Sequence, residues 1–382
     1  MSELFIIVLV LFFLLAAYYV FFLLRILSGL KNLSKHSDSY GAKCEEFVSV
    51  IVPFRNESEN IVRCLESLEA QNYNRDKFEI VFVNDFSEDD SLEKLCSNKK
   101  LENVKILSLP DNLEKVSSKK ATVRYGIENS KGKIIVTTDA DCVHSHTWLK
   151  SLVNNFDEDT GVVAGPVQFE EEKTIFQKMQ KLEFQSLVIS GTGLIGIKKP
   201  VICNAANFAF RKDLFFKLDG FDDNINVSSG DDVFIMQKVA HQTTYKVKFC
   251  KDNECIVKTK SSKKIKEFFG QRKRWAGKIN FFYNKLFVLS LVPVFLFYLT
   301  VLIQLILGIF ITNIFLFTCL ISFLLKTLTD FIVLKEGNRM LNQKLPVGVF
   351  FVSEFLHIPY IIFSVLGGFF GSYNWKGRNT TH

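Results

Sequence analysis

Apolar residues are spread unevenly along the chain, in long runs at both ends and in short runs between polar segments in the middle. Leu4 to Leu24 is an unbroken apolar run of 21 residues. As a helix, a run of this length spans about 30 Å, which matches the hydrocarbon core of a bilayer. Apolar stretches recur at 286–311, 313–334 and 347–372. The pattern predicts membrane helices on both sides of a more polar central region.

The charges that flank the first apolar run predict its orientation. No basic segment precedes the run and no cleavage site follows it, which indicates a retained anchor over residues 1–27 rather than a removed signal peptide. One acidic residue precedes the run and three basic residues follow it: Glu3, Arg25, Lys31 and Lys35. The positive-inside rule therefore predicts that the central region lies in the cytoplasm.

The C-terminal apolar region, residues 286–372, predicts two or three further spans. A break at Thr312 and Asn313 predicts a hairpin between its first two stretches. If the last stretch spans the membrane, its basic tail ends outside, against the positive-inside rule; a re-entrant or interfacial segment is the alternative. Lys326 and Asp330 are four residues apart within the stretch 313–334. They can be a functional pair inside the membrane, or a structural pair whose charges neutralise each other.

Residues 45–260 alternate short apolar runs with more polar, helix-like segments. Strands are expected at 47–53, 78–83, 104–109 and 133–138, with helices from Ser58, as a cap, to about Ala70 and over 119–129. Short apolar strands that alternate with helices indicate an α/β fold, with a parallel sheet covered on both faces. Ligands of such sheets bind at the carboxyl ends of the strands.

Acidic residues follow two of the expected strands at their carboxyl ends. Asp85 follows the strand at 78–83, and Asp139 and Asp141 follow the strand at 133–138. Carboxylates from separate segments can converge there on a hard cation such as Mg²⁺ or Mn²⁺, whose remaining ligands are commonly substrate phosphates. An Asp-x-Asp turn is also common as a solvated strand end, so the turn alone leaves both interpretations open.

Two further motifs carry candidate chemistry. Asp231 and Asp232 follow Gly230 at the start of an expected helix, where carboxylates interact favourably with the helix dipole. They can therefore be a bare helix cap or supply a general base. The segment 271–275, Gln-Arg-Lys-Arg-Trp, stands before the C-terminal apolar region. Its Arg274 can pair bidentately with phosphate oxygens, and an aromatic-basic membrane interface belt is the alternative.

Charge and cysteine content narrow the possible partners. The net charge is +7, and much of the excess lies between Lys258 and Lys278. A basic stretch beside a membrane favours anionic lipid or phosphate over nucleic acid. The eight cysteines include no CxxC pair, which fits a reducing compartment without disulfides. No second ligand cluster accompanies Cys142, His144 and His146, so a zinc site is not expected.

Taken in order, these motifs resemble those of the family 2 glycosyltransferases with the GT-A fold, specifically the membrane-embedded bacterial members. The resemblance covers about residues 45–285 and rests mainly on five segments: 50–57, 83–89, 137–142, 230–232 and the QxxRW-like 271–275. The family usually has Asp-Asp-Gly-Ser in the second of these segments. This chain has Asn84 and Phe86 at the first and third positions, and Asp85 carries the expected nucleotide contact.

The resemblance implies a role for each site residue. It implies nucleotide contacts, a site for Mg²⁺ or Mn²⁺, and groups that act on the acceptor and the leaving diphosphate. The nucleotide contacts are Pro53, Glu57, Asp85, Lys120 and Asp139; the metal ligands are Asp141 and Asp139; the catalytic groups are Asp232 as general base, Asp231, Arg274, Trp275 and Gln271. Asn207 is expected to hydrogen-bond an acceptor hydroxyl.

The implied architecture is an α/β GT-A domain, with a mostly parallel sheet, at 45–260, a basic interfacial segment at 261–285, and transmembrane helices at 1–27 and 286–372. The implied activity is inverting transfer of a hexosyl or N-acetylhexosaminyl group from a nucleotide-diphospho-sugar, expected to be UDP-linked. The acceptor is expected to be a membrane-associated lipid or glycan at the cytoplasmic face of a bacterial inner membrane, in cell-envelope glycan biosynthesis. Donor, acceptor and membrane lipids are the expected partners, without nucleic acid.

The alternatives are a processive polysaccharide synthase, a catalytically silent nucleotide-sugar-binding scaffold, and a transporter with a regulatory domain.

Overall fold

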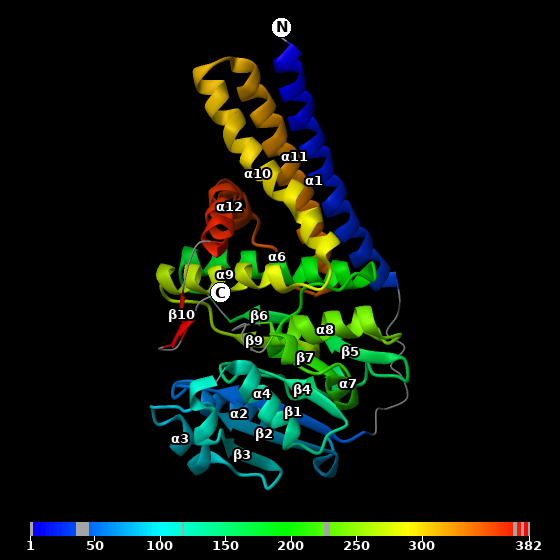
Figure 1. Cartoon of the computed structure of the whole chain (residues 1–382), viewed down its shortest axis with the longest axis vertical. Coiled ribbons are helices and arrows are strands. Elements are labelled where there is room, and N and C mark those ends of the chain that lie inside the picture. Colours follow the sequence, from blue (N-terminus) through cyan, green and yellow to red (C-terminus); the bar gives the residue numbers. More distant parts are fainter. Residues whose placement is uncertain are drawn as a thin grey trace.

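The computed structural model describes residues 3–35, 46–116, 118–170, 172–224, 230–369, 373–375 and 378–380. Figure 1 shows a sheet domain at one end, a layer of two helices across it, and long helices beyond that layer. The long helices come from the two ends of the chain and the sheet domain comes from its middle, as the apolar pattern predicts.

In the described part of the chain, seven strands form the main sheet, in the order β3-β2-β1-β4-β7-β5-β8. Their bounds are β1 Val48–Phe54, β2 Phe78–Asn84, β3 Val104–Ser108, β4 Ile134–Thr137, β5 Thr160–Ala164, β7 Phe208–Arg211 and β8 Lys246–Phe249. β1 pairs in parallel with β2 and β4, and β2 pairs in parallel with β3. The four strands expected from the sequence are confirmed, and the carboxyl ends of β1, β2 and β4 lie next to one another.

β7 runs antiparallel to both of its neighbours, β4 and β5, so the sheet is mixed. The apolar pattern did not predict this, because it records which faces of a strand are buried and not the direction of the chain. Phe208 at the start of β7 pairs with Thr137 at the end of β4. The hydroxyl of Thr137 also donates to the carbonyl of Ala205 at 2.8 Å. The segment before β7 therefore lies at the same edge as the acidic turns.

Alternate residues of β1 enter two hydrophobic cores on opposite faces of the sheet. Val50 and Val52 pack into one core, and Ile51 packs into the other. Successive side chains of a strand point to opposite faces, so a strand buried on both faces is apolar throughout. The covering helices are α2 Ile61–Glu69, α3 Ser91–Asn98, α4 Lys119–Glu128, α5 Trp148–Val153, α7 Lys212–Lys217 and α8 Asp231–Gln242.

The first of these helices begins later than the sequence predicts. Asn60, and not Ser58, occupies the position before the first residue of α2. The backbone N–H groups of Asn60 and Ile61 both donate to the carbonyl of Glu57, at 2.8 and 2.9 Å. A turn made by backbone hydrogen bonds therefore replaces the expected side-chain cap.

Helices α6, Ile175–Gly196, and α9, Ile265–Gly277, form the layer between the sheet and the long helices (Figure 1). α1, Glu3–Lys35, continues past the predicted end of the anchor and packs along α6. A Cβ built on Gly29 would lie 1.8 Å from the carbonyl oxygen of Gly193. Glycine therefore permits a backbone approach that a larger residue would block, and this contact joins α1 to the sheet domain.

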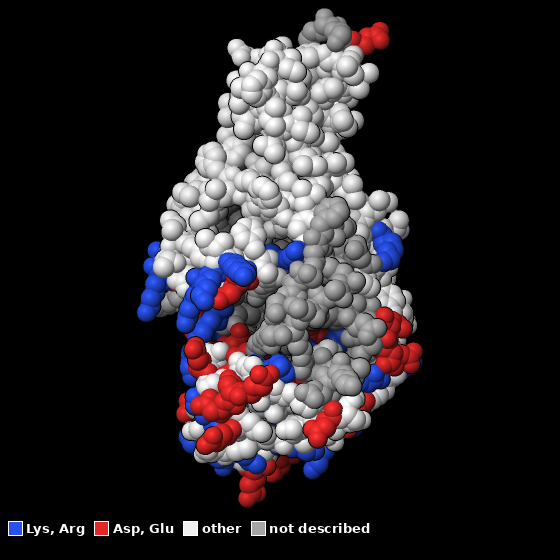
Figure 2. Space-filling view, turned by 60° about the vertical axis from the view of Figure 1, so that its left-hand side comes forward, with Lys and Arg blue, Asp and Glu red and all other residues white. Residues whose placement is uncertain are grey.

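Four helices in the described part of the chain are long and apolar enough to cross a membrane. They are α1, α10 Lys285–Phe310, α11 Asn313–Met340 and α12 Val347–Phe369. α1, α10 and α11 pack together, whereas α12 packs mainly against α9 and α10. Figure 2 shows a surface over the long helices that is almost without charged residues, with Lys and Arg gathered where it ends. The C-terminal region thus contains three helices of spanning length.

A cluster of charged and polar side chains is buried among these helices. The ammonium group of Lys326 lies 2.9 Å from Asp330 and also contacts Glu354 of α12. The hydroxyl of Tyr19, from α1, donates to Asp330 at 2.6 Å. Lys326 is fully buried, and its charge is compensated by the two carboxylates. The pair noticed in the sequence is therefore part of a cluster that joins α1, α11 and α12.

Replacing Lys326 by Met should destabilise the protein by about 3 to 5 kcal/mol, because it leaves two buried carboxylates without their cation. Thermal and denaturant unfolding in detergent measure this change. The matched control is Arg339→Met on the same helix, where an exposed pair with Glu336 should contribute less than about 1 kcal/mol. Equal, small losses in both variants would show that the cluster does not hold the helices together.

Candidate functional site

A cavity of about 1310 Å³ lies where the carboxyl ends of β1, β2 and β4 face α6, α8 and α9. It continues between α1, α10 and α12, where most of its lining is apolar. Ten of the predicted site residues line it: Pro53, Glu57, Asp85, Asp139, Asp141, Asp231, Asp232, Gln271, Arg274 and Trp275. Lys120 is not among the lining residues. One cavity therefore joins the acidic edge of the sheet to the apolar helices.

The parallel register of the strands brings the first acidic turn to this cavity. Phe54 at the end of β1 pairs with Asn84 at the end of β2. The backbone N–H of Asp85 then donates to the carbonyl of Phe54 at 2.9 Å, which holds the two strand ends together. Thr138 donates in the same way to Ile51, at 3.2 Å, and so fixes the turn after β4. Glu57, Asp85 and the Asp-Ala-Asp turn thus face one space.

The two departures from the family pattern form a closed turn. Phe86 adopts a φ of 51°, a left-handed conformation that a glycine would take without strain. The side-chain oxygen of Asn84 accepts from the N–H of Ser87 at 3.0 Å and closes this turn. Asn56, also left-handed with a φ of 52°, accepts from the N–H of Glu88 at 2.8 Å. Asn84 therefore holds the turn, while the adjacent Asp85 lines the cavity.

Lys119, at the start of α4, links acidic residues from two different elements. Its ammonium group lies 2.6 Å from Asp139, which follows β4, and 3.4 Å from Asp231, which begins α8. Burial opposes the charge of this lysine, but Asp139 and Asp231 outweigh it and hold the pKa of Lys119 above its ordinary value. Lys119 therefore stays charged at neutral pH and holds the two carboxylates at one place.

Lys120 lies on a different side of the same helix. Its ammonium group lies 4.5 Å from the centre of the Phe234 ring, and only 1% of the residue is exposed. Burial lowers the pKa of Lys120 to about 8, although Asp231 and Asp232 oppose the shift. Successive positions on a helix point about 100° apart, so only one of two neighbouring lysines faces the cavity. The sequence analysis chose the lysine that does not.

The turn before α8 places the second acidic pair. Gly230 has a φ of 90°, and a Cβ there would come within 2.9 Å of the Phe234 ring, so the position favours glycine. Asp231 pairs with Lys119, and a side-chain oxygen of Asp232 accepts from the N–H of Val233 at 2.7 Å. Burial raises the pKa of Asp232, against the opposing charge of the nearby Lys278, and Asp231 adds to the rise. Asp232 is therefore a better proton acceptor than an exposed aspartate.

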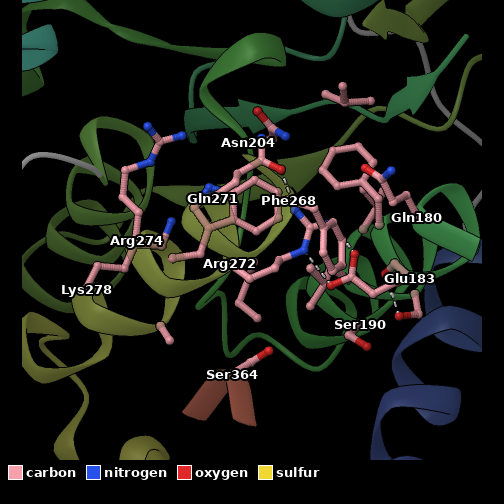
Figure 3. A pocket seen from close by; sticks show the side chains of 18 of the residues that line it. Gln180, Glu183, Ser190, Asn204, Phe268, Gln271, Arg272, Arg274, Lys278 and Ser364 are labelled. Carbon is pink, nitrogen blue, oxygen red and sulfur yellow. Dashed lines mark hydrogen bonds and ion pairs between the residues drawn. The ribbon is translucent and has the colours of Figure 1, made fainter. Parts of the chain in front are cut away.

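The opposite wall of the cavity is α9, which carries the predicted motif at 271–275. Gln271, Arg274 and Trp275 all line the cavity. Figure 3 shows Arg274 and Lys278 on the same side of this region, away from Glu183. The two basic residues are four positions apart, so they lie one above the other on the helix. The wall opposite the carboxylates thus carries positive charge.

Among the charged residues of the cavity that the sequence analysis did not select are Arg55, Lys119 and Lys278. Arg55 donates to the carbonyl of Asp85 at 2.9 Å and pairs with Glu88. A sequence signal existed for each of them. Arg55 lies within the recognised segment 50–57, Lys119 precedes the chosen lysine, and Lys278 follows Arg274 by one helical turn.

Asp139 and Asp141 are the carboxylates that could hold a divalent cation at this edge. Both line the cavity, and carboxylate oxygens are ligands that Mg²⁺ and Mn²⁺ prefer. A cation held by two carboxylates can take its remaining ligands from substrate phosphates and water. Asp330, Glu354 and His357 also lie close enough to share a cation, and Lys326 already forms ion pairs with both of those carboxylates. Lys119 pairs with Asp139 in the same way, so it is the location at the strand ends, where ligands of such sheets bind, that favours Asp139 and Asp141.

Two other polar residues that the sequence analysis considered are structural. Asn207 is fully buried, accepts from the indole N–H of Trp148 at 3.0 Å and donates to the carbonyls of Pro166 and Cys255. The expectation that it contacts an acceptor is therefore wrong. The ring nitrogens of His144 are hydrogen-bonded to Ser67 and Thr138, at 2.9 and 2.8 Å. Neither residue lines the cavity.

Comparisons with known proteins agree with this arrangement. The family model described as Glycosyl transferase family 2 matches residues 49–218, and Glycosyl transferase family group 2 matches residues 134–366. Glycosyltransferase AglE of Haloferax volcanii is 30% identical over 196 residues, which are 48% of this chain and 59% of that protein. Poly-beta-1,6-N-acetyl-D-glucosamine synthase of Staphylococcus aureus is 26% identical over 145 residues, 37% of this chain and 34% of that protein. The chain thus covers less than two thirds of either relative.

A solved structure matches nearly the whole chain. The mannosyltransferase PcManGT from Pyrobaculum calidifontis, in complex with GDP-Man and Mn²⁺, has a TM-score of 0.55 at 17% sequence identity. The match covers 95% of this chain and 99% of that one. At this identity the likeness shows the fold, which includes the mixed sheet flanked by helices.

His144→Gln tests whether this histidine is a structural residue and not a metal ligand. Burial lowers the pKa of His144 to about 3, so the folded protein keeps the ring neutral while the unfolded chain takes up a proton below about pH 6.5. Wild-type stability should therefore fall by about 2 to 3 kcal/mol between pH 7 and pH 4 through this group, and the variant should lack that part of the loss.

Unfolding at several pH values measures this effect, and Mn²⁺ affinity should be unchanged in the variant. The control is His146→Gln, at an exposed histidine, which should leave the pH dependence as in the wild type. A weaker Mn²⁺ affinity in His144→Gln would assign His144 to a metal site.

Proposed function

Because the chain belongs to glycosyl transferase family group 2, we propose that it is a glycosyltransferase that moves a sugar, with inversion, from a nucleotide-diphospho-sugar to a membrane-associated lipid or glycan acceptor. The observation that carries this proposal is the single cavity that extends from the acidic edge of the sheet to the apolar helices. An enzyme that joins a polar donor to a lipid-linked acceptor needs both surfaces at one reacting centre.

The acidic edge of the sheet is suited to the donor. We assign nucleoside contacts to Pro53, Glu57 and Asp85, and the metal-bound diphosphate to Asp139 and Asp141. A bound Mg²⁺ or Mn²⁺ would neutralise charge on the diphosphate as it leaves. The structural neighbour that binds GDP-Man and Mn²⁺ supports a divalent cation here. The sequence-based expectation of a UDP-linked donor is kept as part of the proposal.

Lys119 takes the role that the sequence analysis gave to Lys120. Its ammonium group lies 2.6 Å from Asp139, on the cavity side, where it can also attract the negatively charged donor. Lys120 is buried against Phe234 and has no place on the cavity wall. The predicted contact between Lys120 and the nucleotide is not favoured by this arrangement.

Asp232 is the proposed general base. The acceptor oxygen attacks the anomeric carbon, its proton passes to a carboxylate oxygen of Asp232, and the bond from that carbon to the diphosphate oxygen breaks. A raised pKa makes Asp232 a stronger base than an exposed aspartate. Asp231 is held by Lys119 and would keep the helix start in place. One displacement inverts the carbon and needs no covalent intermediate on the enzyme.

The wall formed by α9 is proposed to bind the leaving group and the acceptor. Arg274 can form two parallel hydrogen bonds to a phosphate, which stabilises the charge that develops as the sugar departs. Gln271 and Trp275 are the proposed acceptor contacts, and Lys278 adds positive charge one turn further on. The acceptor lipid would lie along the apolar part of the cavity between α1, α10 and α12. We place the catalytic domain on the cytoplasmic side, as the flanking charges predict.

A processive polysaccharide synthase is the second candidate. The match to the poly-N-acetylglucosamine synthase and the extension of the cavity into the long helices favour it. The length of the product distinguishes the two candidates, because single addition gives one product mass and processive synthesis gives a ladder.

The proposal is tested by nucleotide release from a panel of UDP-, GDP- and TDP-sugars, with the purified protein in anionic lipid. Each donor is tested with Mn²⁺ or EDTA and with or without a lipid extract as acceptor. Release that needs both the metal and the extract supports the transferase and identifies its donor. Nucleotide binding without release from any donor would favour a silent nucleotide-sugar-binding protein.

Asp141→Asn should weaken Mn²⁺-dependent donor binding by more than about tenfold, because an amide is a poor substitute for a carboxylate ligand. Titration calorimetry with nucleotide, in Mn²⁺ and in EDTA, measures the loss. The control is Asp213→Asn, at an exposed carboxylate in the first turn of α7. Unchanged affinity in Asp141→Asn would remove this residue from the metal site.

Asp232→Asn should lower the rate of transfer by about 100-fold or more and leave donor binding intact, since the amide cannot accept the proton. Single-turnover transfer and calorimetry measure the two effects separately. Below the raised pKa of Asp232 the wild-type rate should fall as the carboxylate becomes protonated, and the variant should lack this acid limb. Parallel losses of binding and transfer would instead assign Asp232 to the helix start as a structural residue.

A further inference from the structure

Arg272 lies within the motif on α9 and lines the cavity, but its charge is paired within the protein. Only 4% of the residue is exposed, and its guanidinium carbon lies between two aromatic rings. The distances are 4.5 Å to the centre of the Phe268 ring and 4.4 Å to that of Trp275. Figure 3 shows its guanidinium group turned toward Glu183, whereas Arg274 lies on the other side.

Glu183, on α6, binds Arg272 with both carboxylate oxygens. The Nε–H of Arg272 donates to Oε1 of Glu183 at 2.9 Å, and its Nη2 group donates to Oε2. The hydroxyl of Tyr360, on α12, donates to the same Oε1 at 2.8 Å. The ring of Tyr360 also lies 5.7 Å from that of Phe268. One carboxylate therefore joins α6, α9 and α12.

The remaining contacts of Arg272 reach two residues assigned to the acceptor. Its Nη1 group donates to the side-chain oxygen of Gln271, which leaves the amide nitrogen of Gln271 as the donor for another partner. Its planar face lies against Trp275, and Phe184 of α6 lies 5.9 Å from the same indole ring. The orientations of Gln271 and Trp275 thus depend on one guanidinium group.

We propose that Glu183 and Arg272 are positioning residues, which orient Gln271 and Trp275 for transfer to the acceptor, and that Tyr360 extends this control to the membrane helix α12. This inference rests on the proposed function. A buried ion pair gains little net stability, because desolvation of both charges offsets their attraction. A bidentate arginine–carboxylate pair does fix direction, and lysine cannot reproduce its fork. The expected effect is therefore on the rate of transfer and not on donor binding.

The first test is Glu183→Gln, which keeps the size of the side chain but removes its charge. We expect kcat for transfer to fall about 10- to 100-fold, as for a reacting group displaced by a fraction of an ångström to 1 Å. The affinity for nucleotide and Mn²⁺ should stay within about twofold, because the donor contacts lie on the sheet edge. Acrylamide quenching should show altered exposure of tryptophan, since Trp275 loses the fixed guanidinium on its face.

The second test is a double-mutant cycle with Arg272→Lys. Either substitution breaks the same pair, so kcat of the double variant should lie within about twofold of kcat of the less active single variant. If the fold-losses in kcat of the two single variants multiply in the double variant, Glu183 and Arg272 act independently, and this result would overturn the proposal. Tyr360→Phe, which removes one hydroxyl, should lower kcat by a smaller factor and carries the same test if Glu183→Gln fails to fold.

The matched control is Glu170→Gln. Glu170 forms an exposed ion pair with Arg63 at 2.7 Å, and neither residue lines the cavity. This variant should transfer sugar like the wild type. Full activity in Glu183→Gln and Tyr360→Phe, or a loss of donor binding that parallels the loss of transfer, would overturn the positioning role. If the wild type releases no nucleotide with any donor and extract, the proposed function itself fails. If the wild type is active and Glu183→Gln is equally active, only the positioning role fails.

Discussion

The site depends on the compensation of negative charge where the sheet edge meets α8. Asp139 and Asp231 come from elements separated by about ninety residues, and two carboxylates repel each other in a partly buried place. Lys119 contacts both of them and allows them to lie together. Since Asp232 follows Asp231 in the first turn of α8, Lys119 also ties the Asp-Ala-Asp turn to the proposed base. The first turn of α4 thus connects the edge of the sheet to α8 across the cavity.

The layer of α6 and α9 has the same connecting role between the sheet domain and the long helices. α6 contacts α1 through glycine, with a backbone approach that a larger residue would block. It also supplies Glu183 to α9 and α12. The cavity therefore has a wall on the side of the long helices that is built from segments far apart in sequence. Two groups of buried ion pairs, the Lys326 cluster and the pair of Arg272 with Glu183, each join three helices.

Much of this arrangement could be predicted from local patterns. Apolar runs of bilayer length predicted the long helices, and strands that are apolar throughout predicted a sheet covered on both faces. Asp85, Asp139, Asp141, Asp232 and Arg274 were selected from their places at strand ends or on helices together with the resemblance to the family 2 motifs, and all five line the cavity. A parallel register brings the ends of β1, β2 and β4 together whatever the rest of the fold does, so the shared edge of Asp85, Asp139 and Asp141 could be predicted from the sequence.

Other features were decided only by the tertiary structure. The sequence offered two neighbouring lysines, and only the packing of α4 shows that Lys119 faces Asp139 while Lys120 lies against Phe234. The reversed direction of β7 and the buried place of Asn207 left no mark in the apolar pattern. Glu183 and Arg272 are 89 residues apart. Hydrophobic periodicity is a local property that records which face of an element is buried, whereas the partner of a charged side chain is set by how distant elements pack together.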